Sequence, residues 1–421
     1  MTEILLKNII VAGAAKDILI RDRLISRIAP AGTVEPSPVC VVMDCSGKTA
    51  IPGFINMHTH SGMTLMKGVG EDMKFHDWLA RIWKMESKID PEYIYWATKA
   101  AAVEMIRTGT TLFNDQYWFV PTARQAMSEM GVRGAFSYVI LDNGAPDKSG
   151  KDQLEECRAL WEESRGWDDG SFFTVGIHAV YSVCEDNIRR AVEFAREHDL
   201  LIHMHLSETK KEVDDCMAAH GGMSPVEYMD SLGALDHRTI AAHTLWLSEK
   251  DVQILGERKV TCVHNINSNT KLASGYHFLY NELRDAGANL CIGTDGCASS
   301  NNLDMLEAMK TSAIVQKAWR WSPDALPVDE LFDMGTVNGA RALRENTGVL
   351  REGAVADINI VNTDSVFFLS DAPFLANLIY SAHSSCIESV IGAGRFLMRD
   401  YKINGEDEIL RHSRNLIKRI R

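Results

Sequence analysis

Short apolar runs alternate with long amphipathic segments through the middle of this 421-residue chain. Eight of these runs have the length and composition of buried β-strands. They lie at residues 54–58, 110–115, 134–140, 173–178, 201–205, 239–243, 260–265 and 289–295. Helical periodicity fills the intervals, most clearly at residues 93–107, 122–130, 185–197, 248–256 and 303–318. Eight strand-then-helix units predict an α/β chain built around a (β/α)8 TIM-like barrel.

Both ends of the chain have a different sequence pattern, in which short β-like runs are separated by turn residues. Neither end alone has enough strands for an independent core. We therefore expect the two ends to pair into one small β-sandwich domain. The predicted division places the first part of this domain at residues 1–51 and the barrel at 52–347. Residues 348–421 supply the second part of the sandwich and a C-terminal helix.

Charge and composition indicate which kinds of molecule the protein binds. A formal net charge of -13 argues against a nucleic-acid-binding surface, which is normally basic. No run approaches the ~18 apolar residues of a membrane span, and the N-terminus lacks the features of a signal peptide. The nine scattered cysteines contain no C-x-x-C pair, which indicates reduced thiols in a cytoplasmic protein. A small-molecule substrate is expected, with neither nucleic acid nor membrane as a partner.

Histidines and one aspartate stand at the ends of six of the predicted strands. In a barrel of this type the C-terminal strand ends converge on one mouth. Imidazole nitrogens and a carboxylate at one point suit a divalent ion such as zinc. His58 and His60 point the same way in an extended segment, so both can bind one ion. The residues at these ends are His58, His60, His178, His205, His243, His264 and Asp295.

The segment PGFINMHTHSGMTLMKGV (52–69) resembles the first-strand signature of the amidohydrolase superfamily. Further segments are similar to one branch of that superfamily, which contains the methylthioadenosine/S-adenosylhomocysteine deaminases and the triazine hydrolases. These segments are IHMHLSETKKE (202–212), AAHTLWL (241–247), HNINSNTKLASG (264–275), GTDGCASSNNLDM (293–305) and GVLREGAVADINIVN (348–362). They occur in the family's order and span nearly the whole chain.

The resemblance implies a ligand set of His58, His60, His205 and Asp295. Members with two metals carry a bridging modified lysine where this chain has His178, so one divalent metal is expected. Zn2+ is preferred, and Fe2+ remains the alternative. A bound divalent ion lowers the pKa of water from 15.7 to roughly 7, so metal-bound hydroxide would attack the ring carbon.

The resemblance also implies catalytic roles for Glu208, His243 and Asp295. Asp295 would move the proton of the attacking water, and His243 would orient that water. Glu208 would protonate the ring nitrogen beside the attacked carbon. The alternative for Glu208 is a solvated carboxylate in a turn.

Substrate binding is assigned by the same resemblance to Glu86, His178, Glu208 and Asp295. Glu86 lies in RIWKMESK, which is similar to a segment whose glutamate receives the ribose hydroxyls in nucleoside deaminases. The alternative interpretation of Glu86 is an exposed residue on a surface helix. The alternative interpretation of His178 is a purely structural residue. Arg133 precedes the third barrel strand and is interpreted as structural.

The implied function is release of ammonia from the adenine ring of a nucleoside such as 5'-methylthioadenosine, 5'-deoxyadenosine or adenosine. The alternative is hydrolysis of another aminated or halogenated heterocycle, such as a guanine-like base, a pterin or an s-triazine. Family members that bind a substrate carboxylate present arginines after the third strand, where this chain offers only Lys148 or Lys151. S-adenosylhomocysteine is therefore disfavoured. A homo-oligomer is common among relatives and is left open.

Ile266 replaces the proline that is usual in the family's HNPxSN motif. The methionines at positions 57, 63, 66 and 73 could form a thioether pocket, and core packing is the preferred interpretation.

Overall fold

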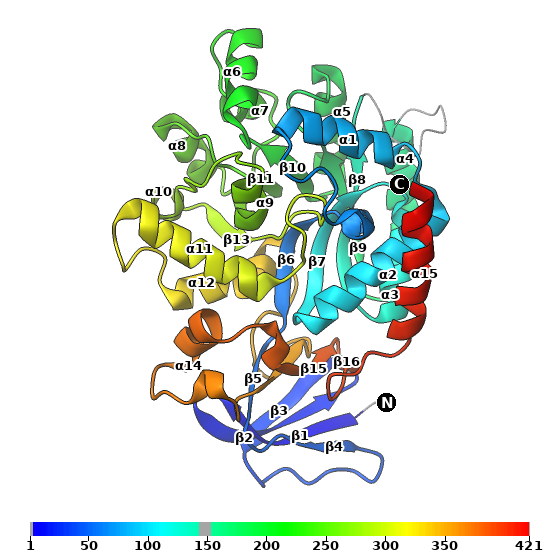
Figure 1. Cartoon of the computed structure of the whole chain (residues 1–421), viewed down its shortest axis with the longest axis vertical. Coiled ribbons are helices and arrows are strands. Elements are labelled where there is room, and N and C mark those ends of the chain that lie inside the picture. Colours follow the sequence, from blue (N-terminus) through cyan, green and yellow to red (C-terminus); the bar gives the residue numbers. More distant parts are fainter. Residues whose placement is uncertain (1–2, 143–152, 421) are drawn as a thin grey trace.

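The computed structural model describes residues 3–142 and 153–420. Eight parallel strands form a barrel sheet in the order in which they occur along the chain (Figure 1). The ring closes where the backbone N–H of Asp295, just after the eighth strand, donates to the carbonyl of His58 at 2.9 Å. The strands are β6 (Phe54–Thr59), β7 (Thr110–Tyr117), β8 (Arg133–Ile140), β9 (Phe172–Ile177), β10 (Ile202–Leu206), β11 (Thr239–His243), β12 (Thr261–His264) and β13 (Asn289–Ile292). The predicted TIM-like barrel is confirmed.

Burial explains why the strands read as continuous apolar runs. Every residue of β7 and β8 is buried, because side chains on one face fill the barrel and those on the other meet the helices. Several helices of the barrel begin at a residue whose side chain caps the first turn. Asp90 accepts a hydrogen bond from Tyr93 at the start of α2, and Ser248 forms a capping box at the start of α8.

Most helices of the barrel lie outside its strands, and α1 crosses above the strand ends (Figure 1). These elements are η1 (Ser61–Met66), α1 (Phe75–Glu86), α2 (Pro91–Arg107), α3 (Val120–Met130), α4 (Gln153–Ser164), α5 (Glu185–Glu197), α6 (Lys210–Ala219), α7 (Pro225–Ser231), α8 (Glu249–Glu257), α9 (Ile266–Lys271), α10 (Tyr280–Ala286), α11 (Met305–Arg320), α12 (Val328–Met334) and α13 (Val337–Ala342). Within the described residues, no helix has both the length and the apolar character needed to cross a membrane.

Strands from the two ends of the chain form a second sheet below the barrel (Figure 1). It has eight strands, and β5 pairs antiparallel with β14, which joins the N-terminal and C-terminal segments. Its buried isoleucines, including Ile4, Ile18, Ile358 and Ile391, form a core separate from that of the barrel. The strands are β1 (Glu3–Val11), β2 (Ala14–Arg21), β3 (Leu24–Pro30), β4 (Val41–Asp44), β5 (Lys48–Pro52), β14 (Ile358–Asn362), β15 (Ile387–Gly392) and β16 (Arg395–Met398).

The remaining elements lie between β14 and β15 or follow β16. They are η2 (Val366–Phe368), α14 (Phe374–Ala376), η3 (Asn377–Ser381), η4 (Ser384–Cys386) and α15 (Glu406–Ile420). Helix α15 lies against α2, where the rings of His412 and Trp96 stack at 4.0 Å.

Arg133 fastens the barrel to the second sheet at the end away from the mouth. It is the first residue of β8 and only 3% exposed, and it forms ion pairs with Glu345 at 2.7 Å and with Asp357. The backbone N–H of Gly53 also donates to the carbonyl of Asp357 at 2.9 Å. These contacts agree with a structural role for Arg133.

Candidate active site

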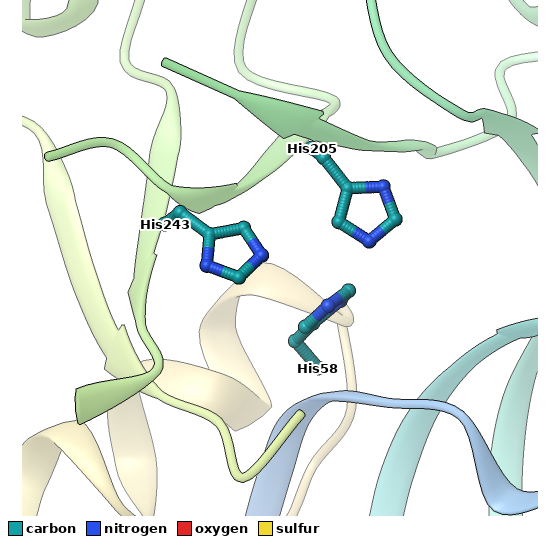
Figure 2. Close-up of side chains that lie close together, drawn as sticks. All are labelled: His58, His205 and His243. Carbon is teal, nitrogen blue, oxygen red and sulfur yellow. The ribbon is translucent and has the colours of Figure 1, made fainter. Parts of the chain in front are cut away.

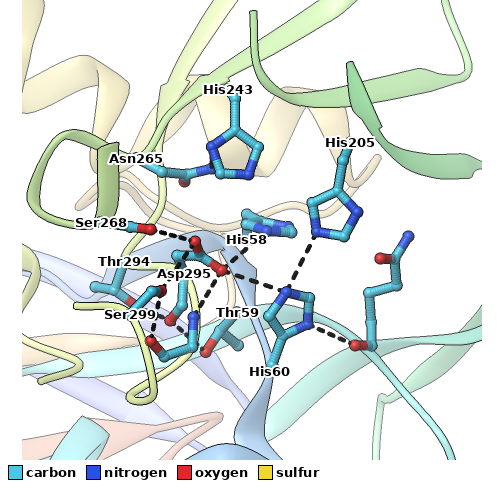
Figure 3. Close-up of polar contacts among 12 residues, drawn as sticks. His58, Thr59, His60, His205, His243, Asn265, Ser268, Thr294, Asp295 and Ser299 are labelled. Atoms are coloured by element: carbon cyan, nitrogen blue, oxygen red, sulfur yellow. Dashed lines mark hydrogen bonds and ion pairs between the residues drawn. The ribbon is translucent and has the colours of Figure 1, made fainter. Parts of the chain in front are cut away.

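The side chains of His58, His60, His205 and Asp295 converge at the mouth of the barrel (Figure 3). Oδ1 of Asp295 lies 3.4 Å from Nε2 of His58 and 3.2 Å from Nε2 of His60. Nε2 of His205 lies 3.3 Å from Nε2 of His60. The convergence follows from the fold, because these residues stand at the C-terminal ends of β6 and β10 and just after β13.

Hydrogen bonds to the outer ring nitrogens fix how these histidines face. Nδ1 of His60 donates to the carbonyl of Gln116 at 2.7 Å, and Nδ1 of His205 donates to the carbonyl of His178 at 2.9 Å. Each ring therefore turns the lone pair of Nε2 toward the common centre. Nε2 of His58 is buried and has no hydrogen-bond partner among the described residues.

Two lone pairs 3.3 Å apart repel each other unless a proton or a cation lies between them. A tetrahedral zinc ion with Zn–N distances of ~2.0–2.1 Å separates its ligand atoms by roughly 3.3 Å. The three separations of 3.2, 3.3 and 3.4 Å in the structure match that value. The donor set of three imidazoles and one carboxylate also suits a borderline divalent ion. This cluster therefore fits a divalent metal ion.

The charge balance of the cluster also favours a cation. Burial favours the protonated form of Asp295, but His58 and His60 outweigh it and hold the pKa of this carboxyl well below its usual range. Burial likewise opposes the charged form of His60, but the Asp295 carboxylate outweighs it and raises the pKa of that ring to about 9. An ionised, buried carboxylate thus has one positive charge beside it. A metal ion can supply that charge in place of the proton.

Asp295 is held in place by two hydroxyls. Its Oδ2 accepts hydrogen bonds from Ser268 at 2.5 Å and from Ser299 at 3.1 Å (Figure 3). Ser268 belongs to α9, which begins at Ile266, a fully buried residue. The replacement of the family's proline by Ile266 therefore leaves a helical turn that reaches the carboxylate.

His243 faces the same centre from β11, beside the rings of His58 and His205 (Figure 2). Its Nδ1 donates to Oδ1 of Asn269 at 2.7 Å, which leaves the Nε2 lone pair toward the centre. Nε2 lies 3.9 Å from Oε2 of Glu208. His243 itself has a φ of 76°, a left-handed conformation that is costly for a histidine.

Glu208 is buried, at 7% exposure, so the interpretation as a solvated turn carboxylate is wrong. Burial is the main cause that raises the pKa of this carboxyl. Its Oε1 accepts a weak hydrogen bond from Ser274 at 3.4 Å. A buried carboxyl that keeps its proton can act as a general acid.

Glu86 is the last residue of α1 and is only 3% exposed, so the interpretation as a surface residue is also wrong. Burial raises the pKa of its carboxyl to about 7. Its Oε1 accepts a hydrogen bond from the Tyr117 hydroxyl at 2.7 Å. Oε2 has no hydrogen-bond partner among the described residues and remains available as an acceptor.

Nearly all of the predicted site residues line one pocket. Its lining includes His60, Glu86, His178, His205, Glu208, His243 and Asp295, and His58 is fully buried among these residues. His178 lines it just after β9, and its Nδ1 hydrogen-bonds to Ser182 at 2.7 Å. Of the four methionines, Met57 and Met66 are fully buried in the core, Met73 packs against that core, and Met63 lines the pocket. Lys148 and Lys151 lie outside the described residues.

Sequence reasoning missed several residues that support this site. Glu212 is buried and accepts the backbone N–H groups of Ser207 at 2.9 Å and of Glu208 at 2.7 Å, which fixes the turn carrying Glu208. His203 hydrogen-bonds to His58, and Tyr117 to Glu86. For His203 a signal was present, since H-M-H in β10 repeats the period-two pattern of H-T-H in β6.

The fold and the cluster together define a barrel protein with a buried metal-binding centre at its mouth. The model of the amidohydrolase family matches residues 49–397. This chain belongs to the amidohydrolase family, as the sequence motifs predict.

Similar proteins share both sequence and fold with this chain. It is 42% identical over 374 residues to a 5'-deoxyadenosine deaminase of Methanoregula boonei. The alignment covers 88% of this chain and 84% of the relative. It is 40% identical over 372 residues to 5-methylthioadenosine/S-adenosylhomocysteine deaminase 1 of Archaeoglobus fulgidus. That alignment covers 88% of this chain and 87% of the relative.

Among solved structures, an adenosine deaminase from Xanthomonas campestris with bound zinc matches with a TM-score of 0.92 at 30% identity, covering 100% of this chain and 98% of that one. A zinc complex of atrazine chlorohydrolase from Arthrobacter aurescens matches with a TM-score of 0.88 at 21% identity. The match covers 98% of this chain and 100% of the chlorohydrolase chain. The latter likeness concerns the fold alone.

Proposed function

We propose that this chain is a metal-dependent aminohydrolase that releases ammonia from the adenine ring of a nucleoside. The observation that carries the proposal is one pocket in which a His–Asp cluster, the buried acid Glu208 and the buried carboxyl Glu86 face one another. His58, His60, His205 and Asp295 would hold a single divalent ion, Zn2+. Two of the similar proteins have solved structures with zinc.

When bound, a divalent ion lowers the pKa of water and so supplies a nucleophile near neutral pH. The residues of the chain direct the protons. Asp295 would take the proton of the attacking water and later pass it to the departing ammonia. His243 would orient the water through Nε2, because Asn269 occupies its Nδ1.

Glu208 would protonate the ring nitrogen next to the attacked carbon. Its burial raises the pKa of the carboxyl, which favours the protonated form that this step requires. General-acid catalysis of this kind contributes ~10²–10⁴-fold to rate. Glu212 holds the turn on which Glu208 stands.

Glu86 would receive the two ribose hydroxyls, and this residue favours a nucleoside over a free heterocycle. A carboxylate accepts two adjacent hydroxyl donors, and burial in the pocket excludes competing water. His178 would contact the purine edge. The alternative reaction, on a guanine-like base, a pterin or an s-triazine, offers no ribose hydroxyls to the buried carboxyl of Glu86, whose Oε1 still accepts from Tyr117.

The wall of the pocket favours an uncharged group at the 5' position. Helix α1 contributes an apolar face of Phe75, Trp78, Leu79 and Trp83. None of the described lining residues is lysine or arginine, so this described part of the wall offers no side-chain cation to a substrate carboxylate or phosphate. Adenosine, 5'-deoxyadenosine and 5'-methylthioadenosine fit this wall. S-adenosylhomocysteine, with its charged amino-acid group, is disfavoured by it. The names 5'-deoxyadenosine deaminase and adenosine deaminase agree with this class, whereas the name of the Archaeoglobus fulgidus relative also includes S-adenosylhomocysteine.

The test is Glu86→Ala assayed for ammonia release from adenosine and from free adenine. Loss of charged hydrogen bonds worth ~1.5–3 kcal/mol should lower kcat/KM for the nucleoside roughly 10- to 100-fold. Turnover of the free base should change little. The control is Glu71→Ala, which removes an exposed carboxylate ahead of α1 and should leave both rates unchanged. Equal loss on both substrates would refute the ribose role.

A further inference from the structure

His203 is buried beside the candidate metal ligands and has no part in the mechanism above. It lies two residues before His205 on β10, so both side chains face the barrel interior. Its side chain is fully buried, and its Nε2 lies 2.8 Å from Nδ1 of His58. Its carbonyl accepts a hydrogen bond from the Gln116 amide at 2.8 Å, which fixes the backbone at this point.

Hydrogen bonds continue from His203 to the neighbouring strands. Nδ1 of His203 lies 3.2 Å from Oγ of Ser137 on β8. The same hydroxyl lies 2.5 Å from Oγ1 of Thr174 on β9. The four side chains of His58, His203, Ser137 and Thr174 thus form one buried chain of hydrogen bonds across the barrel.

The direction of the protons along this chain follows from the role of His58. If Nε2 of His58 offers a lone pair to a metal ion, its Nδ1 carries the hydrogen and donates to Nε2 of His203. His203 must then carry its own hydrogen on Nδ1 and donate to Ser137, whose hydroxyl forms a further hydrogen bond with that of Thr174. The opposite direction would place a hydrogen on Nε2 of His58 and block metal binding.

His58 differs from the other two histidines of the cluster in the source of its partner. His60 and His205 donate to backbone carbonyls, which no substitution removes. His58 donates to a side chain. Groups in this outer position orient a ligating ring, and their loss commonly weakens metal binding 10- to 100-fold.

We propose that His203 is a positioning residue that fixes the tautomer and orientation of His58, and so sets the affinity of the site for its divalent ion. This inference rests on the proposed metal site but is independent of the substrate. It is tested by metal binding alone, so its failure can be distinguished from failure of the nucleoside proposal.

The experiment measures the zinc dissociation constant of the full chain by competition with a chromophoric chelator. His203→Leu removes the acceptor and should weaken zinc binding about 10- to 100-fold. His203→Gln restores an acceptor in its amide oxygen and should recover most of that loss. Ser137→Ala leaves the His203 ring in place but removes its acceptor, and should cause a smaller loss in the same direction.

The matched control is His264→Leu. His264 is another fully buried barrel histidine, and it stacks on Phe278 at 4.4 Å without a hydrogen-bond partner for either ring nitrogen among the described residues. Its replacement removes the same ring from the same barrel and should leave zinc affinity unchanged. Unchanged affinity in His203→Leu, no recovery in His203→Gln, or an equal loss in His264→Leu would overturn the proposal.

Discussion

Glu86→Gln should stabilise the protein at alkaline pH while damaging its activity. Burial raises the pKa of Glu86 from 4.5 to about 7 in the folded chain, so the folded state binds this proton more tightly than the unfolded state. The stabilisation from the protonated carboxyl is therefore complete below pH 4.5 and is lost as the pH rises through about 7. Glutamine keeps the acceptor for Tyr117 without the buried charge.

The magnitude follows from the size of the pKa change. At ~1.4 kcal/mol for each tenfold change in proton affinity, the rise to about 7 corresponds to about 3 kcal/mol at pH 8. For a chain of 421 residues this predicts a Tm increase of roughly 3 °C. At pH 4.5 the two proteins should melt at nearly the same temperature.

Calorimetry of the zinc-loaded wild type and Glu86→Gln between pH 4.5 and 8 measures this difference. Glu71→Gln, an exposed carboxylate outside the pocket, is the control and should not raise Tm. In parallel, KM for adenosine should fall in the wild type as the pH rises through about 7, because the ionised carboxylate accepts both ribose hydroxyls. The variant should lose this dependence. A Tm difference that is absent, or equal at both ends of the pH range, would refute the reasoning.

Three further outcomes follow from the site and the fold. Glu208→Gln should lower kcat by ~10²–10⁴-fold with unchanged zinc content, measured by initial rates and metal analysis; an unchanged kcat would remove Glu208 from the acid role. Exhaustive chelation should abolish ammonia release and lower Tm, and added Zn2+ should restore both; full activity without metal would contradict the ligand assignment. Arg133→Ala leaves Asp357 buried without its ion-pair partner and should destabilise the fold by about 3–5 kcal/mol, while KM stays unchanged in the folded fraction.

The barrel could be predicted from sequence because its strands are buried on both faces. Such strands appear as continuous apolar runs, and a catalytic polar residue at the end of each run stands out against them. His58, His60, His205 and Asp295 are among the strand-end residues found in this way, and the family resemblance selected them as the ligand set. The structure brings them close together. The pairing of β5 with β14 could be anticipated only as a need of the two ends for each other, since nothing local sets that register.

Burial of single polar residues was beyond the reach of sequence. By local pattern Glu86 and Glu208 are ordinary helix and turn glutamates. Only the family resemblance predicted roles for them, and the structure shows that both are buried. Tyr117, Ser268 and Ser299 act through partners far away in the chain, which local pattern does not reveal.

The most direct test of the proposed function is ammonia release by the zinc-loaded chain across a panel of substrates. The panel contains adenosine, 5'-deoxyadenosine, 5'-methylthioadenosine, S-adenosylhomocysteine, guanine, a pterin and melamine. The structure predicts strong activity on the three adenine nucleosides with uncharged 5' groups, and weaker activity on S-adenosylhomocysteine. Activity confined to guanine, the pterin or melamine would contradict the nucleoside assignment and the role given to Glu86.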